Sequence, residues 1–356
     1  MKKNLAAFCA LLMFPAWAHA AQSHAVVLMY HRFGEDRYPS TSIRLEQFDA
    51  QLRYLAEHDY HIWPLARVIR YLRSHAPLPD RTVALTVDDA FASVYTEAYP
   101  RLKARRWPLT VFVSTDPVDR GLPGYMRWSE MREMRANGVY FANHSADHTH
   151  LIARNPGEDE AAWRRRVQGD VLEAQRRLEA ELGPEVNRAP KLFAYPYGEY
   201  DTALAALVRS LGYIAMGQQS GAIGPNTDPR ALPRYPMAEA FAELDRFAAK
   251  ARSLPLALTE VAPWDPVVTG ANPPAMSAVL TDPEVDPSTL RCYASGQGQI
   301  EVSWPDRRAR RFTVVAHAPF PAGRGRYNCT APAAGGRYRW YSHLWVIPPI
   351  GADLGD

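Results

Sequence analysis

Five short, almost continuous apolar runs recur between residues 25 and 200, and each ends in polar residues. Between them lie segments with apolar residues at helical spacing, such as Phe48, Leu52 and Leu55. A run that is apolar on both faces is typical of a strand in a parallel sheet, and strands that alternate with helices predict βαβ connections. We therefore expect an α/β fold with a parallel sheet or barrel over residues 21–252. The runs are AVVLMYH (25–31), TVALTVDD (82–89), PLTVFVST (108–115), GVYFANHS (138–145) and KLFAYPYGEY (191–200).

Residues 1–20 have the pattern of a cleaved secretory signal. Lys2 and Lys3 precede an apolar run, and Ala18, His19 and Ala20 provide the small-x-small pattern of a cleavage site. The apolar run is too short to span a bilayer, so we favour cleavage near Ala20 over a membrane anchor. The mature protein is therefore expected in the periplasm or outside the cell, with no stable membrane span.

The cysteines indicate one disulfide. Cys9 lies inside the predicted signal, which leaves Cys292 and Cys329 in the mature chain. Exported proteins meet oxidising conditions, so we expect these two residues to pair, with two buried free thiols as the alternative.

Composition and charge indicate an ordinary globular protein. The 356 residues are 47% hydrophobic and 22% charged, which is enough to bury a sizeable core. The formal net charge of +3 falls to about +1 without the two lysines of the signal. This balance gives no indication of a nucleic-acid partner.

The sequence pattern changes near Leu254. Residues 253–285 are rich in proline, alanine and glycine with little periodicity, which predicts a linker or packing segment. In 286–350, short alternating runs are separated by turn residues, which predicts a small all-β, sandwich-like domain. The tail 351–356 is expected to fray. The aromatic residues of this part, more typical of a β-domain core than of a carbohydrate platform, are Trp304, Tyr338, Trp340, Tyr341 and Trp345.

Two adjacent carboxylates, Asp88 and Asp89, come where the run TVALTV stops. Neighbouring side chains on a regular strand face opposite ways, so both can reach one pocket only at the end of the strand. Barrel enzymes place catalytic groups at the C-terminal ends of their strands, where one carboxylate could bind a metal and the other take a proton from water. A helix N-cap or a solvated turn is the alternative for this pair alone.

Three histidines, His144, His148 and His150, follow another run within the block NHSADHTH. His144 and His148 are four residues apart, so a single helical turn would place both rings on one side, as a divalent metal requires. One carboxylate added to them makes a set that leaves positions open for water and substrate. Core or surface histidines are the alternative, and His150 is left as a supporting or structural residue.

A turn from Tyr195 to Gly198 follows the last run. Its backbone could approach a ligand closely, and its aromatic residues could stack on sugar rings. A buried turn with tyrosines as packing residues is the alternative.

Four motifs in this order, LMYHRF, TVDDAF, HSADH and FAYPYGEY, resemble those of the polysaccharide deacetylase family, which is carbohydrate esterase family four with its NodB-homology domain. The resemblance covers Ala25 to Met237, and the FAYPYG variant is similar to the branch that acts on poly-N-acetylglucosamine. It implies a deformed (β/α) barrel. It also implies Asp88 as the general base and three metal ligands, which are Asp89, His144 and His148.

The resemblance implies metal-dependent hydrolysis of N-acetyl groups in envelope or extracellular polysaccharide that contains N-acetylglucosamine. A divalent metal would polarise the acetyl carbonyl and a water, and Asp88 would take the water's proton. A backbone N–H near Tyr197 would stabilise the oxyanion. Zinc is the favoured metal because it tolerates mixed nitrogen and oxygen ligands, with nickel, cobalt and iron as alternatives.

Two departures from the family pattern bear on the mechanism. Ala194 stands where many members have an arginine that orients the base, and no histidine lies between Gly212 and Arg252 to serve as the late proton donor. We therefore take His31 as the candidate donor or as a support for the base, with a packed histidine as the alternative. The departures leave open a glycan-binding protein with weakened turnover, and an esterase for sugar O-acetyl groups is a third possibility. The sequence makes no prediction of the oligomeric state.

Overall fold

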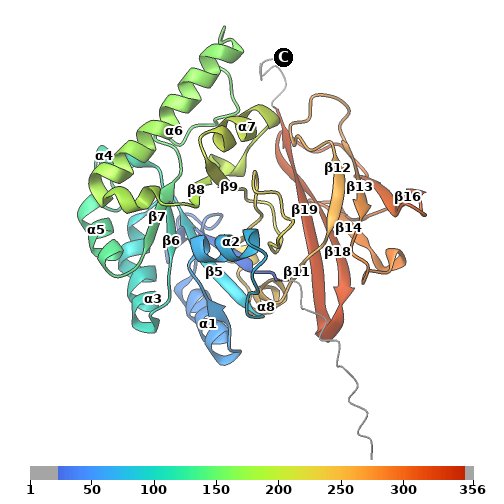
Figure 1. The fold of residues 1–356 in the computed structure, drawn as a ribbon, viewed down its shortest axis with the longest axis horizontal. Helices are drawn as coiled ribbons and strands as arrows, with labels where there is room; N and C mark the ends of the chain where they lie inside the picture. Colours follow the sequence, from blue (N-terminus) through green and yellow to red (C-terminus); the bar gives the residue numbers. More distant parts are fainter. Residues whose placement is uncertain (1–22, 349–356) are drawn as a thin grey trace, which may run out of the picture.

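A computed structural model describes residues 23–348 of the protein. Short strands that alternate with helices form one layered unit, and a stack of longer strands lies beside it, drawn in orange and red in Figure 1. The predicted signal 1–20, with Cys9, and the tail 351–356 lie outside the described residues. Among residues 23–348, no helix is both long and apolar enough to cross a lipid bilayer.

The first unit is built on a curled sheet of eight strands in the order β10-β1-β5-β6-β7-β8-β9, with β4 beside the start of β5. All of its strand pairs are parallel, as predicted. The strands are β1 (Val26–Tyr30), β4 (His61–Ile62), β5 (Thr82–Asp88), β6 (Thr110–Val113), β7 (Tyr140–Asn143), β8 (Lys191–Ala194), β9 (Tyr213–Met216) and β10 (Tyr235–Pro236). A separate parallel pair joins β2 (Arg32–Phe33) to β3 (Ser42–Ile43).

Both faces of this sheet are buried, which explains the continuous apolar runs. In β1, Val26 and Leu28 join one core cluster, while Val27 between them joins a second cluster. Side chains alternate along a strand, so each face of β1 is covered by its own set of neighbours.

The segment before β10 connects the two ends of the curled sheet. Met216 of β9 bridges to Leu232 in parallel, and three residues later Tyr235 pairs with Leu28 of β1. The backbone N–H of Arg234, between these two contacts, donates to the carbonyl of Gln219 at 2.9 Å. The predicted deformed barrel is therefore confirmed, with residues 232–236 as the element that joins its edges.

Helices cover the outside of this sheet (Figure 1). In the first, Phe48, Leu52 and Leu55 are buried, as their spacing predicts. The longest helix begins after Asp159, whose side chain accepts from the backbone N–H of Ala162 at 2.7 Å, and it ends before Gly183. The helices are α1 (Leu45–Glu57), α2 (Leu65–Arg73), α3 (Tyr99–Arg105), α4 (Thr115–Asp119), α5 (Trp128–Ala136), α6 (Glu160–Leu182), α7 (Thr202–Ser210) and α8 (Leu244–Ala251). Shorter helical turns are η1 (Val94–Ala98), η2 (Pro184–Asn187), η3 (Pro196–Gly198), η4 (Glu239–Phe241), η5 (Pro287–Thr289) and η6 (Ala334–Gly336).

Two sheets packed face to face form the second unit, which we call the β-region (residues 254–347). One has the order β11-β19-β18-β14-β15 and the other β12-β13-β17-β16. Met276 and Phe312 of the second sheet share a core with Tyr327 and Trp345 of the first, which confirms the predicted sandwich. The strands are β11 (Leu254–Pro255), β12 (Leu258–Ala262), β13 (Ala275–Leu280), β14 (Arg291–Ala294), β15 (Gly298–Ile300), β16 (Val302–Asp306), β17 (Arg311–Val315), β18 (Gly323–Ala333) and β19 (Arg337–Ile347).

The segment 253–285 differs from the predicted linker, because it contains β11, β12 and β13. β13 pairs with β17 and β12 with β13, so both are structural parts of the sandwich. The prolines that gave this segment its linker-like composition lie mainly in the connection between β12 and β13, where Pro263 and Pro273 follow cis peptide bonds. A proline-rich connection therefore concealed the short strands on either side of it.

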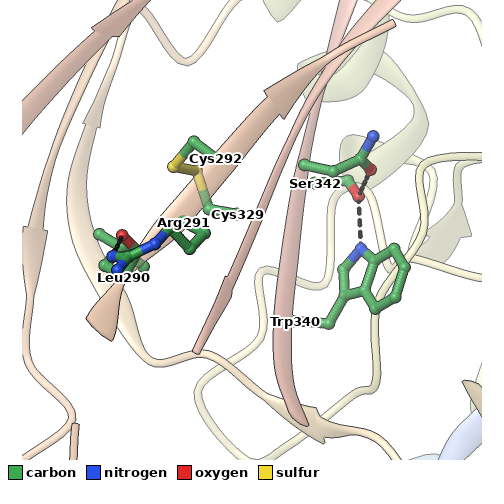
Figure 2. Close-up of a disulfide and its surroundings, with 7 residues drawn as sticks. Leu290, Arg291, Cys292, Cys329, Trp340 and Ser342 are labelled. Atoms are coloured by element: carbon green, nitrogen blue, oxygen red, sulfur yellow. Dashed lines mark hydrogen bonds between the residues drawn. A yellow bond between two sulfur atoms is a disulfide. The ribbon is translucent and has the colours of Figure 1, made fainter. Parts of the chain in front are cut away.

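The predicted disulfide is confirmed and joins neighbouring strands of one sheet (Figure 2). Cys292 of β14 lies directly opposite Cys329 of β18, with 4.1 Å between their Cα atoms. Both residues are fully buried in the sandwich core.

Strand β19 packs against the barrel. Leu344 and Val346 join a core cluster with Phe193 of β8, and the Trp340 ring meets the Tyr235 ring edge-on at 5.5 Å. Most of the aromatic residues singled out above therefore serve packing, and Tyr338, half exposed, is the exception. This contact brings the β-region close to the loops that follow the barrel strands.

Candidate active site

Two carboxylates meet at the end of β5. Asp88 is the last residue of the strand and is fully buried, and the side chain of Asp89 is 13% exposed. Asp89 and Ala90 have left-handed backbone conformations, with φ of 74° and 58°. A regular strand would point the two side chains apart, so this turn allows both to reach one pocket.

The two predicted histidine ligands come together on a loop, and the expected helical turn is absent from this described segment. His144 directly follows β7, and positive φ values at Ser145 (65°) and His148 (56°) bend the chain back. The loop is held by side chains, because Asn143 Oδ1 accepts from the N–H of Ser145 at 2.9 Å and Ser145 Oγ accepts from that of His148 at 3.1 Å. The two rings lie 4.9 Å apart. The prediction that they face one site is right, but the local structure behind it is different.

Asp89, His144 and His148 fit a divalent metal ion. The Nδ1 of His144 lies 2.7 Å from the carbonyl oxygen of Ala194, which can only accept, so Nδ1 carries the proton of the neutral ring. The Nε2 atoms of His144 and His148 lie 3.2 and 3.0 Å from the same oxygen, Asp89 Oδ1. Within residues 23–348, neither Asp89 Oδ1 nor His144 Nε2 has a hydrogen-bond partner, although both are buried. Buried acceptors that face each other call for a cation, and two ligands of one tetrahedral zinc ion lie roughly 3.3 Å apart.

Without a metal, Asp89 and His144 favour their charged forms. Burial alone would raise the pKa of Asp89, but His144 and His148 lower it well below its ordinary value. Burial alone would lower the pKa of His144, but Asp89 and Asp88 raise it above its ordinary value. Protons and metal ions therefore compete for this cluster.

An arginine binds Asp88 through two hydrogen bonds. Nη1 and Nη2 of Arg234 donate to Oδ1 and Oδ2 of Asp88, each at 2.7 Å, and both side chains are fully buried. Arg234 Nε donates to the carbonyl of Gly217 at 2.9 Å, which fixes the plane of the guanidinium. Burial on its own would raise the pKa of Asp88, but Arg234 and then His144 outweigh it and lower that pKa.

The prediction that no arginine orients this carboxylate was therefore wrong. Ala194 does stand in the third motif, but Arg234 reaches Asp88 from the segment that joins the sheet edges. The sequence carried one weak signal for it, a single charge within the run LPRYPM (232–237). The absence of a base-orienting arginine was one ground for expecting weakened turnover, and that ground no longer holds.

His31 lies beside Asp88. It follows β1, and its Nε2 is 4.0 Å from Asp88 Oδ2. Burial lowers the pKa of His31, and the two nearby carboxylates only partly offset this. The structure thus brings His31 to the predicted base.

Tyr197 lies beside the candidate metal ligand His148. It has a left-handed backbone, with φ of 58° and ψ of 1°, and its ring meets the His148 ring at 4.6 Å and stacks on the His150 ring at 4.0 Å. His150 Nδ1 in turn pairs with Glu199 Oε2 at 2.6 Å. The turn also needs its glycine, because a Cβ at Gly198 would lie 2.6 Å from Cβ of Gln218.

Comparison with known sequences finds a matching family. Residues 75–216 match the sequence family described as polysaccharide deacetylase. This part of the chain is therefore similar to a polysaccharide deacetylase domain. The match contains the adjacent carboxylates, the histidine loop and the Tyr197 turn, but it begins after His31 and ends before Arg234.

Two relatives of this chain are called poly-beta-1,6-N-acetyl-D-glucosamine N-deacetylase. The one from Escherichia coli (strain K12) is 25% identical over 240 residues, which are 57% of this chain and 34% of that protein. The one from Staphylococcus aureus (strain MSSA476) is 23% identical over 234 residues, which are 60% of this chain and 78% of that protein. The alignment thus spans about a third of the length of the Escherichia coli relative.

Solved structures share the fold of this barrel. IcaB from Ammonifex degensii is 26% identical with a TM-score of 0.55, over 65% of this chain and 97% of that one. The Streptococcus pyogenes deacetylase PplD in complex with acetate is 21% identical with a TM-score of 0.56, over 65% of this chain and 99% of that one. About a third of the present chain therefore lies outside either alignment.

Proposed function

We propose that the protein is a metal-dependent polysaccharide N-deacetylase that hydrolyses N-acetyl groups of an envelope or extracellular glycan containing N-acetylglucosamine. One observation carries this proposal: a metal-fitting cluster lies beside a second, separately held carboxylate. Asp89 faces both histidines of the loop, while Asp88 is bound by Arg234. A metal-binding protein without turnover has no need of a second buried, ionised carboxylate in the same pocket.

The metal would be held by Asp89, His144 and His148. Three protein ligands of mixed nitrogen and oxygen type, with a position left open, favour zinc, and nickel, cobalt or iron are alternatives. Such an ion, when bound, makes a water more acidic and polarises a carbonyl oxygen.

Asp88 would act as the general base. Its lowered pKa keeps the carboxylate ionised at neutral pH, and each oxygen keeps a lone pair beyond the one that Arg234 occupies. Arg234 fixes the orientation of the carboxylate and stabilises its charge until a proton arrives. Asp88 thus takes the proton of the attacking water.

His31 would supply a proton to the leaving amine. The lowered pKa of His31 makes the ring neutral at rest, so it must first gain a proton. The proton that Asp88 takes from water lies within reach of His31 after a small movement, because Nε2 is 4.0 Å from the carboxylate. The transfer from water to Asp88, then to His31 and then to the amine nitrogen conserves the proton and restores both side chains.

The turn at Tyr197 would complete the site. Its left-handed backbone sits next to the ring of the metal ligand His148. We propose that a backbone N–H of this turn donates to the oxyanion that forms on the acetyl carbon.

The names of the relatives support the substrate class. The Escherichia coli and Staphylococcus aureus proteins are both named for N-deacetylation of poly-beta-1,6-N-acetyl-D-glucosamine. We infer the same class of glycan here, with the protein in the periplasm or secreted. The signal pattern at 1–20 and the Cys292–Cys329 disulfide support export.

The proposal is tested by acetate release from N-acetylglucosamine oligomers with the purified mature protein. We expect equal amounts of acetate and free amine, and a loss of roughly 100-fold or more for Asp88→Asn, which keeps the shape of the side chain but cannot act as a base. Acetylated xylan run in parallel separates amide from ester hydrolysis. Acetate from the xylan alone would support the esterase, and no acetate from either substrate would contradict both enzymes.

A further inference from the structure

The Tyr197 turn needs support from outside itself. Tyrosine in a left-handed conformation is strained, and such residues persist only where their surroundings hold them. On one side the turn stacks against the His150 ring, and on another Gly198 packs against the side chain of Gln218.

A third support comes from the β-region. Arg324, near the start of β18, donates from Nη1 to the carbonyl oxygen of Tyr197 in a short hydrogen bond. The same nitrogen donates to Gln218 Oε1 at 3.2 Å, and Nε lies 3.9 Å from Glu199 Oε1. One side chain of the β-region therefore contacts three residues beside the deacetylase site, which are Tyr197, Glu199 and Gln218.

Two of the residues that Arg324 contacts are next to residues of the proposed mechanism, one on the side of the metal ligands and one on the side of the general base. Tyr197 touches the ring of the proposed ligand His148. Gln218 follows Gly217, whose carbonyl accepts from Arg234, the arginine that clamps Asp88. A displaced Tyr197 turn would therefore disturb the proposed oxyanion donor, and a displaced Gln218 segment would disturb the arginine that holds the base.

We propose that Arg324 is a positioning residue of the deacetylase site and that the β-region thereby completes the active site. This inference rests on the proposed deacetylase function. A charged guanidinium suits the task, because hydrogen bonds from charged donors are stronger than neutral ones and one arginine can bind several acceptors at once. Arg324 lies outside the residues 75–216 that match the family, whereas Tyr197 lies within them.

The test compares three variants of the full mature chain. Arg324→Ala removes all the contacts, and Arg324→Lys keeps the charge with a single donor group. The matched control is Arg311→Ala, which removes a partly exposed arginine of β17 that pairs with Glu260 of β12, in the sheet that does not contain Arg324. Each variant is assayed for kcat and KM with N-acetylglucosamine oligomers, and hydrogen exchange of the backbone is followed by mass spectrometry.

We expect Arg324→Ala to lower kcat roughly 10- to 100-fold with KM changed less than about threefold, because misplaced catalytic groups slow the reaction more than they weaken binding. Arg324→Lys should recover part of the loss. Exchange should quicken at 195–201 and 217–219 but stay unchanged along β19, and Arg311→Ala should match the unaltered protein.

Two results would overturn the proposal. One is an Arg324→Ala protein with the kcat and exchange of the control. The other is faster exchange along the whole of β18 and β19, which would indicate that Arg324 only helps the β-region to dock. An unaltered protein without activity would instead contradict the proposed function, and the exchange at 195–201 would then decide alone whether Arg324 holds the turn.

Discussion

The barrel and the β-region each bury an arginine–aspartate pair, and the two pairs have different surroundings. Arg234 and Asp88 are both fully buried, and Asp88 also faces His31 across 4.0 Å. Arg339 of β19 and Asp282, which are 8% and 3% exposed, pair at 2.5 Å, and Arg339 also binds the exposed Glu284. The pair in the barrel therefore lies beside residues that fit a metal ion. The pair in the β-region does not, among the residues that the structure describes.

This contrast shows where a functional role can be assigned. Burial of an ion pair gives little net stability, because desolvation offsets much of the attraction. The pair at Asp88 is explained by chemistry, since it keeps a carboxylate ionised where a water and a substrate would come. The pair at Asp282 has no titratable groups of this kind arranged around it among the described contacts and is explained by packing.

The largest effects are expected when each arginine is replaced by methionine. Arg234→Met and Arg339→Met each leave a buried carboxylate without its cation, so each should lower the free energy of unfolding by about 3–5 kcal/mol. Only Arg234→Met should also lower kcat/KM of the folded protein, by roughly 100-fold. Urea unfolding and acetate release measure the two effects, and equal losses of activity in the two variants would remove the distinction between the pairs.

The pH dependence of kcat/KM in Arg234→Met tests the same difference between the two arginine–aspartate pairs. In the unaltered protein the pKa of Asp88 is lowered, so its contribution to stability is present above its ordinary range and is lost as the pH falls through the lowered value. Without Arg234, burial would dominate and raise this pKa. The acidic limb of the profile of kcat/KM against pH should therefore move to higher pH in Arg234→Met, and it should stay in place in Arg339→Met.

Removal of the disulfide should affect the β-region alone. The Cys292–Cys329 bridge closes a loop with a sequence separation of 37, so its loss should lower the free energy of unfolding by about 3–4 kcal/mol. In Cys292→Ala/Cys329→Ala, the folded fraction should keep its kcat, because the bridge lies inside the sandwich core. A fall in kcat at a temperature where the variant is fully folded would mean that the two units are coupled more widely than through Arg324.

A smaller effect concerns metal affinity and pH. The raised pKa of His144 means that the metal must displace a proton over a wider pH range than at an ordinary histidine. The apparent affinity should rise by up to about tenfold per pH unit until the pH exceeds this pKa, and then level off. Competition with a chelating dye at several pH values tests this, and an affinity independent of pH between 5 and 8 would contradict it.

The features that the sequence predicts well are those set by neighbouring residues. The apolar runs predict the parallel strands, because both faces of the sheet are buried, and each run ends where its polar residues begin. Asp88 and Asp89 could be placed at a strand end for the same reason. The histidine block also predicts a common site, although the loop turns through left-handed residues at Ser145 and His148 that no spacing rule anticipates.

The features that escape prediction depend on contacts distant in the sequence. Arg234 reaches Asp88 across 146 positions, and Arg324 reaches Tyr197 across 127. The only local signal for Arg234 is a single charge within an otherwise uncharged run, and Arg324 lies among several other arginines. Their roles follow from the closure of the barrel by residues 232–236 and from the docking of β19, which only the three-dimensional structure provides.

The proposed deacetylase activity depends on a single divalent metal ion held by Asp89, His144 and His148. The most direct test is a titration of chelator-stripped protein with zinc, with acetate release from N-acetylglucosamine oligomers as the readout. We predict almost no activity without metal, a linear rise with a break at one ion per chain, and no rise for His148→Ala at the same zinc levels. Full activity in the stripped protein, or a His148→Ala variant that responds like the unaltered chain, would contradict the account.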